Sequence, residues 1–326
     1  MTTDLTTSHN ERAADGAHLG DAPVVRLKHP GRWIAVAAVA VIAAMAVNSM
    51  VTNPKFGWTT VSKYFFSAPI LDGLRITVTL TVIGMIIGFV LGAVVALMRL
   101  SENPVLRTAA FGYVWLVRGI PLLVQLIFWY NISALFPMLS IGIPFGPSFA
   151  SVESNTIMTA YTAAILGLGL NQAAYMAEII RGGIQSVDEG QLEAAATIGL
   201  SRRHTITKVI LPQSMRVILP PTGNETITML KTTSLVSVVA VADLLYSTQL
   251  IYSRTFQTIP MLVMASIWYL ILVSILNVGQ YYLERHYGRG TKRNVPIKRR
   301  LRLPHPFVPG RDAAKANLAV SQEKLS

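Results

Sequence analysis

The chain has 326 residues, of which 52% are apolar and only 13% are charged, and its formal net charge is +12. Because a soluble domain usually carries about 25% charged residues, this composition indicates a membrane protein. The absence of cysteine excludes disulfides, cysteine zinc sites and a thiolate nucleophile. No histidine lies in an apolar run, so the sequence predicts no metal site or proton relay within a membrane.

Six segments approach the roughly 20 apolar residues that a membrane-spanning helix needs. The third carries Arg118, and the fifth, which is the weakest by hydropathy, carries Glu225 and Lys231. The sequence therefore predicts an all-α polytopic bundle with six spans. These spans cover residues 33–51, 76–98, 108–136, 157–177, 217–242 and 255–283.

The first span, residues 33–51, is open to two interpretations. Ala44-Met45-Ala46 resembles the cleavage site of a signal peptide. However, about 32 residues that include acidic side chains precede the span, and an ordinary signal peptide begins with a shorter, basic region. We expect an uncleaved additional helix after a disordered cytoplasmic tail, residues 1–32, whose composition is typical of disorder.

Basic residues cluster at four places that fall on one side of a six-span bundle. Because cytoplasmic loops are enriched in lysine and arginine, this pattern predicts that both termini are cytoplasmic. Residues 286–326 then form a basic cytoplasmic tail close to anionic lipid headgroups. The clusters are Arg26, Lys28 and Arg32; Arg99 and Arg107; Arg202, Arg203, Lys208 and Arg216; and the basic residues of 285–302.

The connection between the fourth and fifth spans, residues 185–213, predicts two short helices with a turn between them. Asp188 can cap the first helix, with Gln191 closing a capping box. Gly199 can adopt the left-handed conformation that ends this helix. Ser201 can cap the second helix, and Pro212 is expected to end it. Such a projection could insert into a groove of another protein.

The spacing of this loop carries a resemblance. Glu193-Ala194-Ala195 is followed by Gly199 after three residues, by Val209 after nine more, and then by Leu211-Pro212. The pattern resembles the EAA loop of ABC importer permeases, in which isoleucine usually stands where this chain has Val209. The coupling residues that the resemblance implies are Glu193, Ala194, Ala195, Gly199, Val209, Leu211 and Pro212.

Other segments resemble the polar amino acid branch of the same family. Residues 118–126 resemble its RGTPLLVQL segment, with Ile120 in place of threonine. Residues 174–184 are similar to the segment before its EAA loop, and residues 223–225 and 230–235 resemble its next span. The resemblance covers roughly residues 70–285 and implies a type I importer permease domain, with the coupling loop at about 185–213.

The resemblance also implies partners. Two permease chains pair, as a homodimer or a heterodimer, and each loop docks on a cytoplasmic ATPase dimer. An extracytoplasmic binding protein delivers a polar amino acid, whose identity stays open. This chain is then a non-catalytic subunit of a bacterial inner membrane, with no nucleic acid partner. ATP and Mg are expected in the ATPase, since this chain has no phosphate loop and is expected to bind no cofactor.

Charges within spans are costly and usually face a bundle interior or a water-filled path. We hypothesise that Lys231 meets the carboxylate of an amino acid, while Glu225 meets its amine or neutralises a neighbour. The alternative is that both form interhelical pairs. The candidate residues for the substrate path are Lys231, Glu225, Thr232, Thr233, Ser234 and Arg118.

Two further features lie near the cytoplasmic end of the fourth span and within the third span. Glu178 and Arg181 are three residues apart, so they can pair on one helix face, and we interpret them as structural. Gly119 and Pro121 follow Arg118 and loosen helix geometry. They predict either a simple kink or a backbone break that lines the path.

Two other classes of membrane protein compete with this interpretation. An ion-coupled secondary transporter would often show matching broken helices in two halves, and the sequence shows no such duplication. A docking subunit that forms no path is the second alternative. A membrane enzyme is disfavoured, because neither a His-Glu-x-x-His pair nor a Gly-x-Ser-x-Gly elbow is present.

Overall fold

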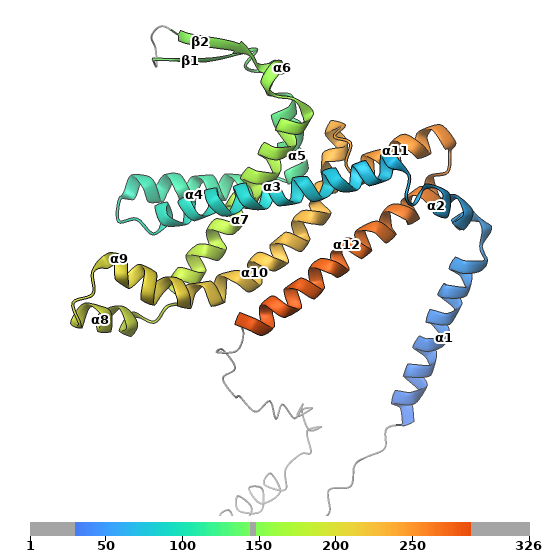
Figure 1. Cartoon of the computed structure of the whole chain (residues 1–326), viewed down its shortest axis with the longest axis horizontal. Helices are drawn as coiled ribbons and strands as arrows, with labels where there is room; N and C mark the ends of the chain where they lie inside the picture. Colours follow the sequence, from blue (N-terminus) through green and yellow to red (C-terminus); the bar gives the residue numbers. More distant parts are fainter. Residues whose placement is uncertain (1–29, 144–147, 288–326) are drawn as a thin grey trace, which may run out of the picture. The chain divides into compact units, whose positions relative to one another are not determined.

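The computed structural model describes residues 30–143 and 148–287, so the two predicted tails lie almost wholly outside the described residues. Helices dominate the described residues (Figure 1). In chain order they are α1 (Pro30–Thr52), α2 (Trp58–Tyr64), α3 (Ala68–Arg99), α4 (Pro104–Gly119), α5 (Leu122–Tyr130), α6 (Ser154–Ile157), α7 (Ala160–Gln185), α8 (Glu189–Thr197), α9 (Arg202–His204), α10 (Leu211–Thr232), α11 (Leu244–Thr255) and α12 (Thr258–Tyr287). A π-helical segment, Thr205–Ile210, precedes α10, and a 3₁₀ segment, Thr233–Val239, follows it.

The predicted spans compare well with these helices. α1, α3, α7 and α12 are each long and apolar enough to cross a membrane, and the count rises to six if two bent pairs each form one span. One bent pair is α4 with α5, and the other joins Arg202–Val239 to Leu244–Thr255. The prediction of an all-α polytopic bundle is therefore confirmed. The third predicted span is broken in its middle, whereas the fifth is helical until the break after Val239, near its predicted end.

The chain divides into two compact units, which α3 and α12 both enter. The first unit comprises residues 30–73 with Leu244–Trp268, and the second comprises Leu74–Asp243 with residues 269–287. In the first unit, Trp268 donates a hydrogen bond from Nε1 to the Phe65 carbonyl over 3.0 Å. The two rings also stack with centroids 4.7 Å apart, so this contact fastens α12 to the turn after α2.

Close helix packing in the second unit depends on glycine. A Cβ atom added at Gly88 would lie 2.5 Å from Cγ of Gln172, and one added at Gly92 would lie 2.6 Å from Cβ of Met176. These glycines therefore let α3 and α7 approach at backbone distance, as small residues do between membrane helices. Buried alanines on α7 have the same effect, namely Ala163, Ala164, Ala173, Ala174 and Ala177.

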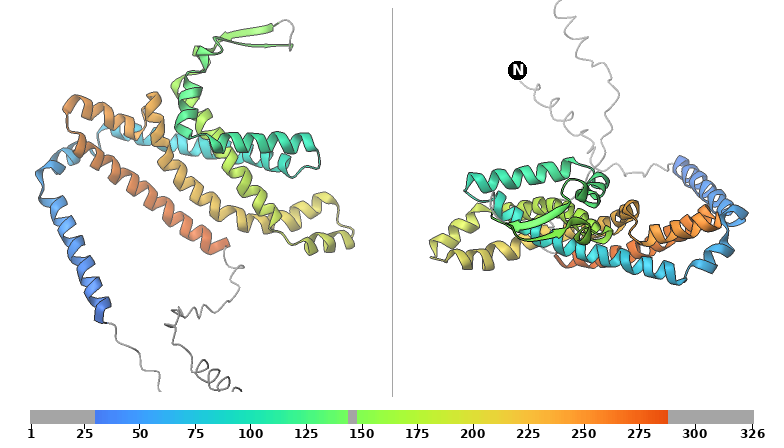
Figure 2. Two further views of the ribbon diagram at one scale, coloured as in Figure 1. Left: turned by 180° about the vertical axis from the view of Figure 1, so that it is seen from behind. Right: turned by 90° about the horizontal axis from the view of Figure 1, so that it is seen from above.

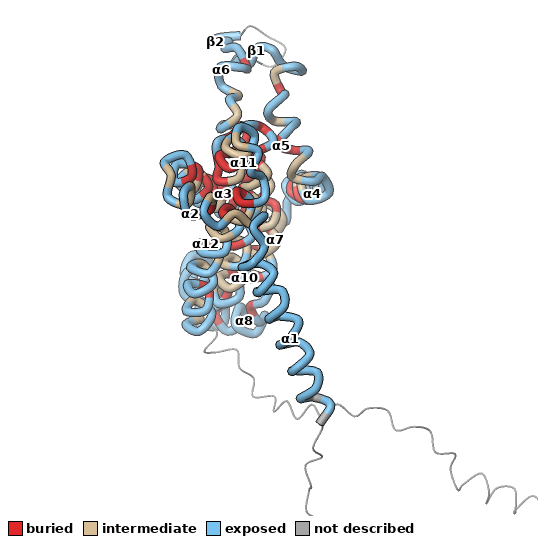
Figure 3. The backbone as a smooth tube through the Cα atoms, turned by 90° about the vertical axis from the view of Figure 1, so that its right-hand side faces the viewer, coloured by how far each residue is buried: buried red, intermediate tan, exposed pale blue. Residues whose placement is uncertain are grey.

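The core of the second unit lies around α7, which packs against α4, α5 and α10. Its main apolar cluster is Leu80, Leu126, Ala164, Leu168, Met229, Val236, Val239 and Val241. In Figure 3, α1 has the colour of exposed residues wherever its burial is described. None of the described α1 side chains is buried within this chain. An apolar helix with such an exposed surface is typical of one that lipid or another chain covers.

Two short strands form a feature that the sequence interpretation missed. β1 (Met138–Gly142) pairs with β2 (Ser148–Glu153) in an antiparallel hairpin, with Leu139 opposite Val152 and Ser140 opposite Ser151. Every described strand residue is exposed. The hairpin precedes α7 and α8 follows it, so the two lie at opposite ends of that helix (Figures 1 and 2).

Candidate functional site: a broken-helix pocket and a projecting loop

The loop after α7 contains the first predicted short helix, α8, whereas the second predicted helix is the start of a helical run, Arg202–Val239, that continues into α10. The side chain of Asp188 caps α8 by accepting a hydrogen bond from the Gly190 amide over 2.8 Å. The backbone amide of Gln191 donates to the main-chain carbonyl of Asp188 rather than to the Asp188 side chain. As predicted, Gly199 is left-handed, with φ of +71°, and the amide of Leu200 bonds the Ala195 carbonyl to close the turn. These bonds give the loop a defined local structure.

The predictions for Ser201 and Pro212 were wrong in part. Ser201 stands at the N-cap position of α9, but its Oγ lies 2.8 Å from Nδ1 of His204 and caps no backbone amide. Pro212 lies within a helical run that continues from Arg202 through the π-helical segment into α10, so it does not end the helix. The π-helical geometry of Thr205–Ile210 lies directly before this proline, and such local adjustment is one way in which a proline is accommodated inside a helix.

The residues that resemble the EAA loop differ in exposure. Glu193, Ala194 and Gly199 are exposed, while Ala195 is buried and Val209 is half-buried. Leu211 and Pro212 are exposed. Sequence interpretation missed Ile198, which is 75% exposed beside Gly199. Its exposure leaves this side chain accessible to another protein.

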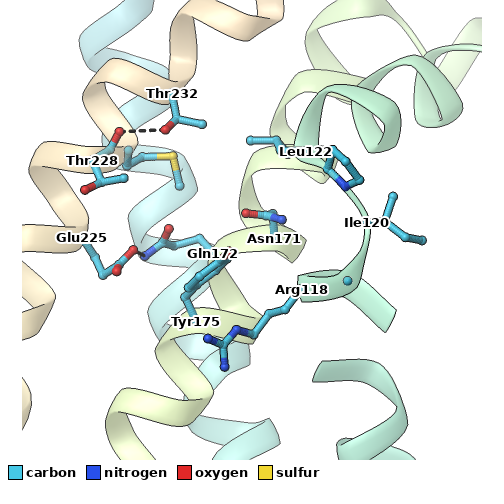
Figure 4. Close-up of a pocket in the computed structure, with 12 residues that line it drawn as sticks. Arg118, Ile120, Leu122, Asn171, Gln172, Tyr175, Glu225, Thr228 and Thr232 are labelled. Atoms are coloured by element: carbon cyan, nitrogen blue, oxygen red, sulfur yellow. Dashed lines mark hydrogen bonds between the residues drawn. The ribbon is translucent and has the colours of Figure 1, made fainter. Parts of the chain in front are cut away.

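A second candidate site is a pocket of about 390 Å³ within the second unit. It lies where α4 breaks, between that break and the facing sides of α7 and α10 (Figure 4). Its polar lining comes from all three helices: Arg118, Asn171, Gln172, Tyr175, Glu225, Thr228 and Thr232. The remaining lining residues are Gly119, Ile120, Pro121, Leu122 and Met229.

The break between α4 and α5 is sharp, with a bend of 100°. Ile120 is extended, and Pro121 precedes the first residue of α5. The buried side chain of Gln125 donates to the carbonyls of Val117 and Ile120, each over 2.8 Å. Since unpaired carbonyls are costly in a membrane, Gln125 makes the break tolerable. Of the two sequence interpretations, the backbone break that lines a pocket is the one observed.

Arg118 and Glu225 place opposite charges on the pocket wall. The Arg118 guanidinium lies 4.9 Å from the centre of the Tyr175 ring, a distance typical of a cation–π contact. On α10, Oε2 of Glu225 accepts a hydrogen bond from Nε2 of Gln172 over 3.2 Å. Figure 4 shows Arg118 and Glu225 on either side of Gln172 and Tyr175. The pocket can therefore meet both an anionic and a cationic group of one small molecule.

The other predicted path residues are placed differently. Thr232 lines the pocket and donates to the Thr228 carbonyl. Lys231 is exposed and lies outside this pocket. Thr233 is buried and Ser234 is half-buried, and their hydroxyls bond the carbonyls of residues 230 and 231. The path roles of Lys231, Thr233 and Ser234 stay predictions.

Glu178 joins two helices through two arginines. The structure places it in the predicted pair with Arg181, with 2.7 Å between Oε2 and Nη2. Its other oxygen pairs with Arg99 at the end of α3, a partner that the sequence did not indicate. This arrangement suits a structural link. Within residues 30–143 and 148–287, no group of three histidine, aspartate or glutamate side chains could hold a metal ion.

In membrane proteins, a broken helix that lines a polar pocket is typical of transporters. This chain has such a pocket at the α4–α5 break. Residues 84–289 match the family described as the inner membrane component of binding-protein-dependent transport systems, and the chain belongs to this family. It is thus the membrane permease of an ABC importer, which decides against the ion-coupled alternative. α1 lies outside the matched residues.

Individual relatives agree with this assignment. The arginine transport system permease protein ArgU of Corynebacterium glutamicum is 44% identical over 275 residues, which are 83% of this chain and 85% of the relative. The L-cystine transport system permease protein TcyB of Bacillus subtilis is 36% identical over 71% of this chain and 92% of its own. A chain from the crystal structure of an amino acid ABC transporter with histidines superposes with a TM-score of 0.59, at 34% identity over 69% of this chain and 97% of that chain.

Proposed function

We propose that this permease imports an amino acid with a cationic side chain and holds it in the pocket at the α4–α5 break. The placement of Arg118 and Glu225 on opposite walls carries the proposal. Arg118 offers a planar fork of donors that fits a carboxylate, and Glu225 offers an acceptor for a cationic group. The similarity to an arginine permease supports the same class of cargo.

The pocket's chemistry suits such a cargo in a membrane. A zwitterion with an added positive charge must exchange water for paired polar groups, because unpaired charge is costly there. Asn171, Thr228 and Thr232 add neutral hydrogen-bonding groups between the two charges. Gln172 already holds one oxygen of Glu225, so this carboxylate is oriented before cargo binds.

The loop around α8 couples this transport to ATP. In the proposed assembly it docks on a cytoplasmic ATPase dimer, which binds ATP and Mg. This placement makes the α8 end of α7 cytoplasmic and the hairpin end extracytoplasmic, where a binding protein delivers the amino acid. A second permease chain, the same or a sister chain, completes the pair. Both termini of this chain are then cytoplasmic, as its basic clusters favour.

The test is ATP-dependent uptake by proteoliposomes that hold the permease with its ATPase and binding protein. Labelled arginine, glutamine, glutamate and cystine would be compared. Glu225→Gln keeps the shape but removes the charge, so arginine uptake is expected to fall on the order of tenfold. Asn224→Ala, which changes the exposed neighbour on α10, is the matched control and should leave uptake unchanged.

Two loop variants test the coupling separately. Glu193→Arg and Gly199→Trp should abolish uptake of every substrate while the permease stays folded. Uptake without ATP, or uptake indifferent to both loop changes, would contradict the ATP-driven mechanism. Uptake of glutamate alone, with Glu225→Gln as active as the wild type, would contradict the cationic cargo.

A further inference from the structure

Three arginines from three helices line a separate pocket of about 290 Å³. It lies where α3 and α7 end and α4 begins. The arginines are Arg99 on α3, Arg107 on α4 and Arg181 on α7, and Thr108, Phe111 and Gln185 complete the lining. Convergence of three guanidinium groups from separate helices concentrates positive charge in one place.

The charge of this pocket is not balanced. Glu178 pairs with both Arg99 and Arg181, so one carboxylate serves two arginines. Among the described residues, Arg107 forms no ion pair within 4 Å. Glu102, the nearby acid in the α3–α4 turn, is exposed and is not part of the lining. The cluster therefore carries an excess of about two positive charges and has donors to spare for an anion with several oxygens.

The surface beside this pocket is apolar. On α4, Val105, Phe111 and Trp115 have exposed fractions of 72%, 55% and 69%. The Phe111 ring also contacts the guanidinium of Arg99, with 5.5 Å between the guanidinium carbon and the ring centre. A small soluble phosphate would use only the arginines. A molecule that joins a phosphate to long apolar chains would use both surfaces.

We infer that this pocket binds the phosphate of an anionic phospholipid whose acyl chains lie along α4. The inference rests on the proposed orientation, which places these helix ends at the cytoplasmic leaflet. Anionic lipids populate that leaflet, and basic pockets between helix ends there suit their headgroups. Arginine binds phosphate through paired N–H donors, which gives such a site geometric preference as well as charge.

Native mass spectrometry of the full permease with its ATPase tests the inference. The probes are phosphatidylglycerol and phosphatidylcholine with identical chains, and the phosphatidylglycerol complex should be the tighter one. Arg107→Gln should weaken phosphatidylglycerol binding on the order of tenfold, as loss of a charge-assisted hydrogen bond to the phosphate does. Arg107→Lys should keep most of the binding. Arg285→Gln removes an exposed arginine from the last turn of α12 and should change nothing.

Binding is measured without transport, so its outcome is independent of the proposed cargo. Equal binding of both lipids, or of phosphatidylglycerol by the wild type and by Arg107→Gln, would overturn the inference. Soluble glycerol 3-phosphate serves as the third probe. Its binding as tightly as phosphatidylglycerol would identify a site for a free phosphate and would also overturn the lipid assignment.

Discussion

Gly88 of α3 and Gln172 of α7 face each other so closely that a Cβ atom at position 88 would lie 2.5 Å from Cγ of Gln172. The same Gln172 donates a hydrogen bond from its amide to Glu225 in the pocket. The contact between two helices is therefore linked, through one side chain, to the position of a carboxylate that faces the proposed cargo.

This link predicts the effect of adding a single methyl group. Gly88→Ala should lower the stability of the permease by about 1–3 kcal/mol, because the new Cβ overpacks a rigid contact. It should also weaken uptake by displacing Gln172. Gly112→Ala, on α4 where nothing lies within 4 Å, is the matched control and should not destabilise. Thermal unfolding of the purified chains would show the difference, and equal midpoints for the two variants would contradict the prediction.

Gln125 provides a second prediction, at the α4–α5 break. Gln125→Leu leaves the carbonyls of Val117 and Ile120 without these donors, and each loss should cost about 1–3 kcal/mol. Arg118 precedes the break, so the KM for cargo should rise as well. Gln257→Leu changes an exposed glutamine in the α11–α12 turn and is the control. Unchanged stability and unchanged KM in Gln125→Leu would show that the break needs no such support.

Ile198 offers a test of the projecting loop. Its side chain is 75% exposed, so a substitution there changes the surface and not the core. If the tip docks in a groove, Ile198→Asp should reduce uptake and ATPase association by tenfold or more, as loss of an apolar anchor does. Ile198→Val keeps the apolar contact and should stay near wild-type activity. The two variants are compared by pull-down of the ATPase, and circular dichroism checks that each variant is folded.

Glu178 predicts a stability effect. Glu178→Gln leaves Arg99 and Arg181 without their shared carboxylate, so we expect a loss of about 1–3 kcal/mol. Glu189→Gln, in the exposed first turn of α8, is the control for removing a negative charge. The measurement is the unfolding midpoint at low and high salt. A midpoint equal to that of the wild type would mean that the two arginines are already accommodated by water or lipid.

Lys231 tests the path beyond the pocket. If it contacts the carboxylate of the cargo, Lys231→Met should lower uptake and substrate-stimulated ATPase activity together, by about tenfold for a lost charge-assisted bond. Lys63→Met, an exposed lysine on α2, is the control. The path role fails if Lys231→Met transports as well as the wild type.

Local features were the most predictable from the sequence. Gly199 has no Cβ, so the left-handed turn after α8 follows from residue type, and Asp188 at a helix start follows from its short acceptor side chain. Gly119 with Pro121 indicated a disturbance of the helix. Residue type alone did not choose between a kink and a 100° break, because that choice depends on Gln125 and its two carbonyl partners.

Long-range relationships were the least predictable. Arg99 meets Glu178 across 79 positions of the chain, and no spacing rule connects them. The hairpin of β1 and β2 escaped an interpretation based on apolar runs, because its strands are short and their residues are exposed. The prediction for Pro212 was wrong because a proline can also lie inside a helix where the preceding turn adopts π-helical geometry.

The placement of the pocket along α7 has a consequence for how a solute crosses. α7 is one continuous helix of 26 residues, so its length is about 39 Å. Asn171, Gln172 and Tyr175 stand near its midpoint, roughly 15 to 23 Å from either end. A solute held there has a similar length of α7 on either side of it. Loading and release can therefore share one set of contacts, and only the barrier above or below them has to change.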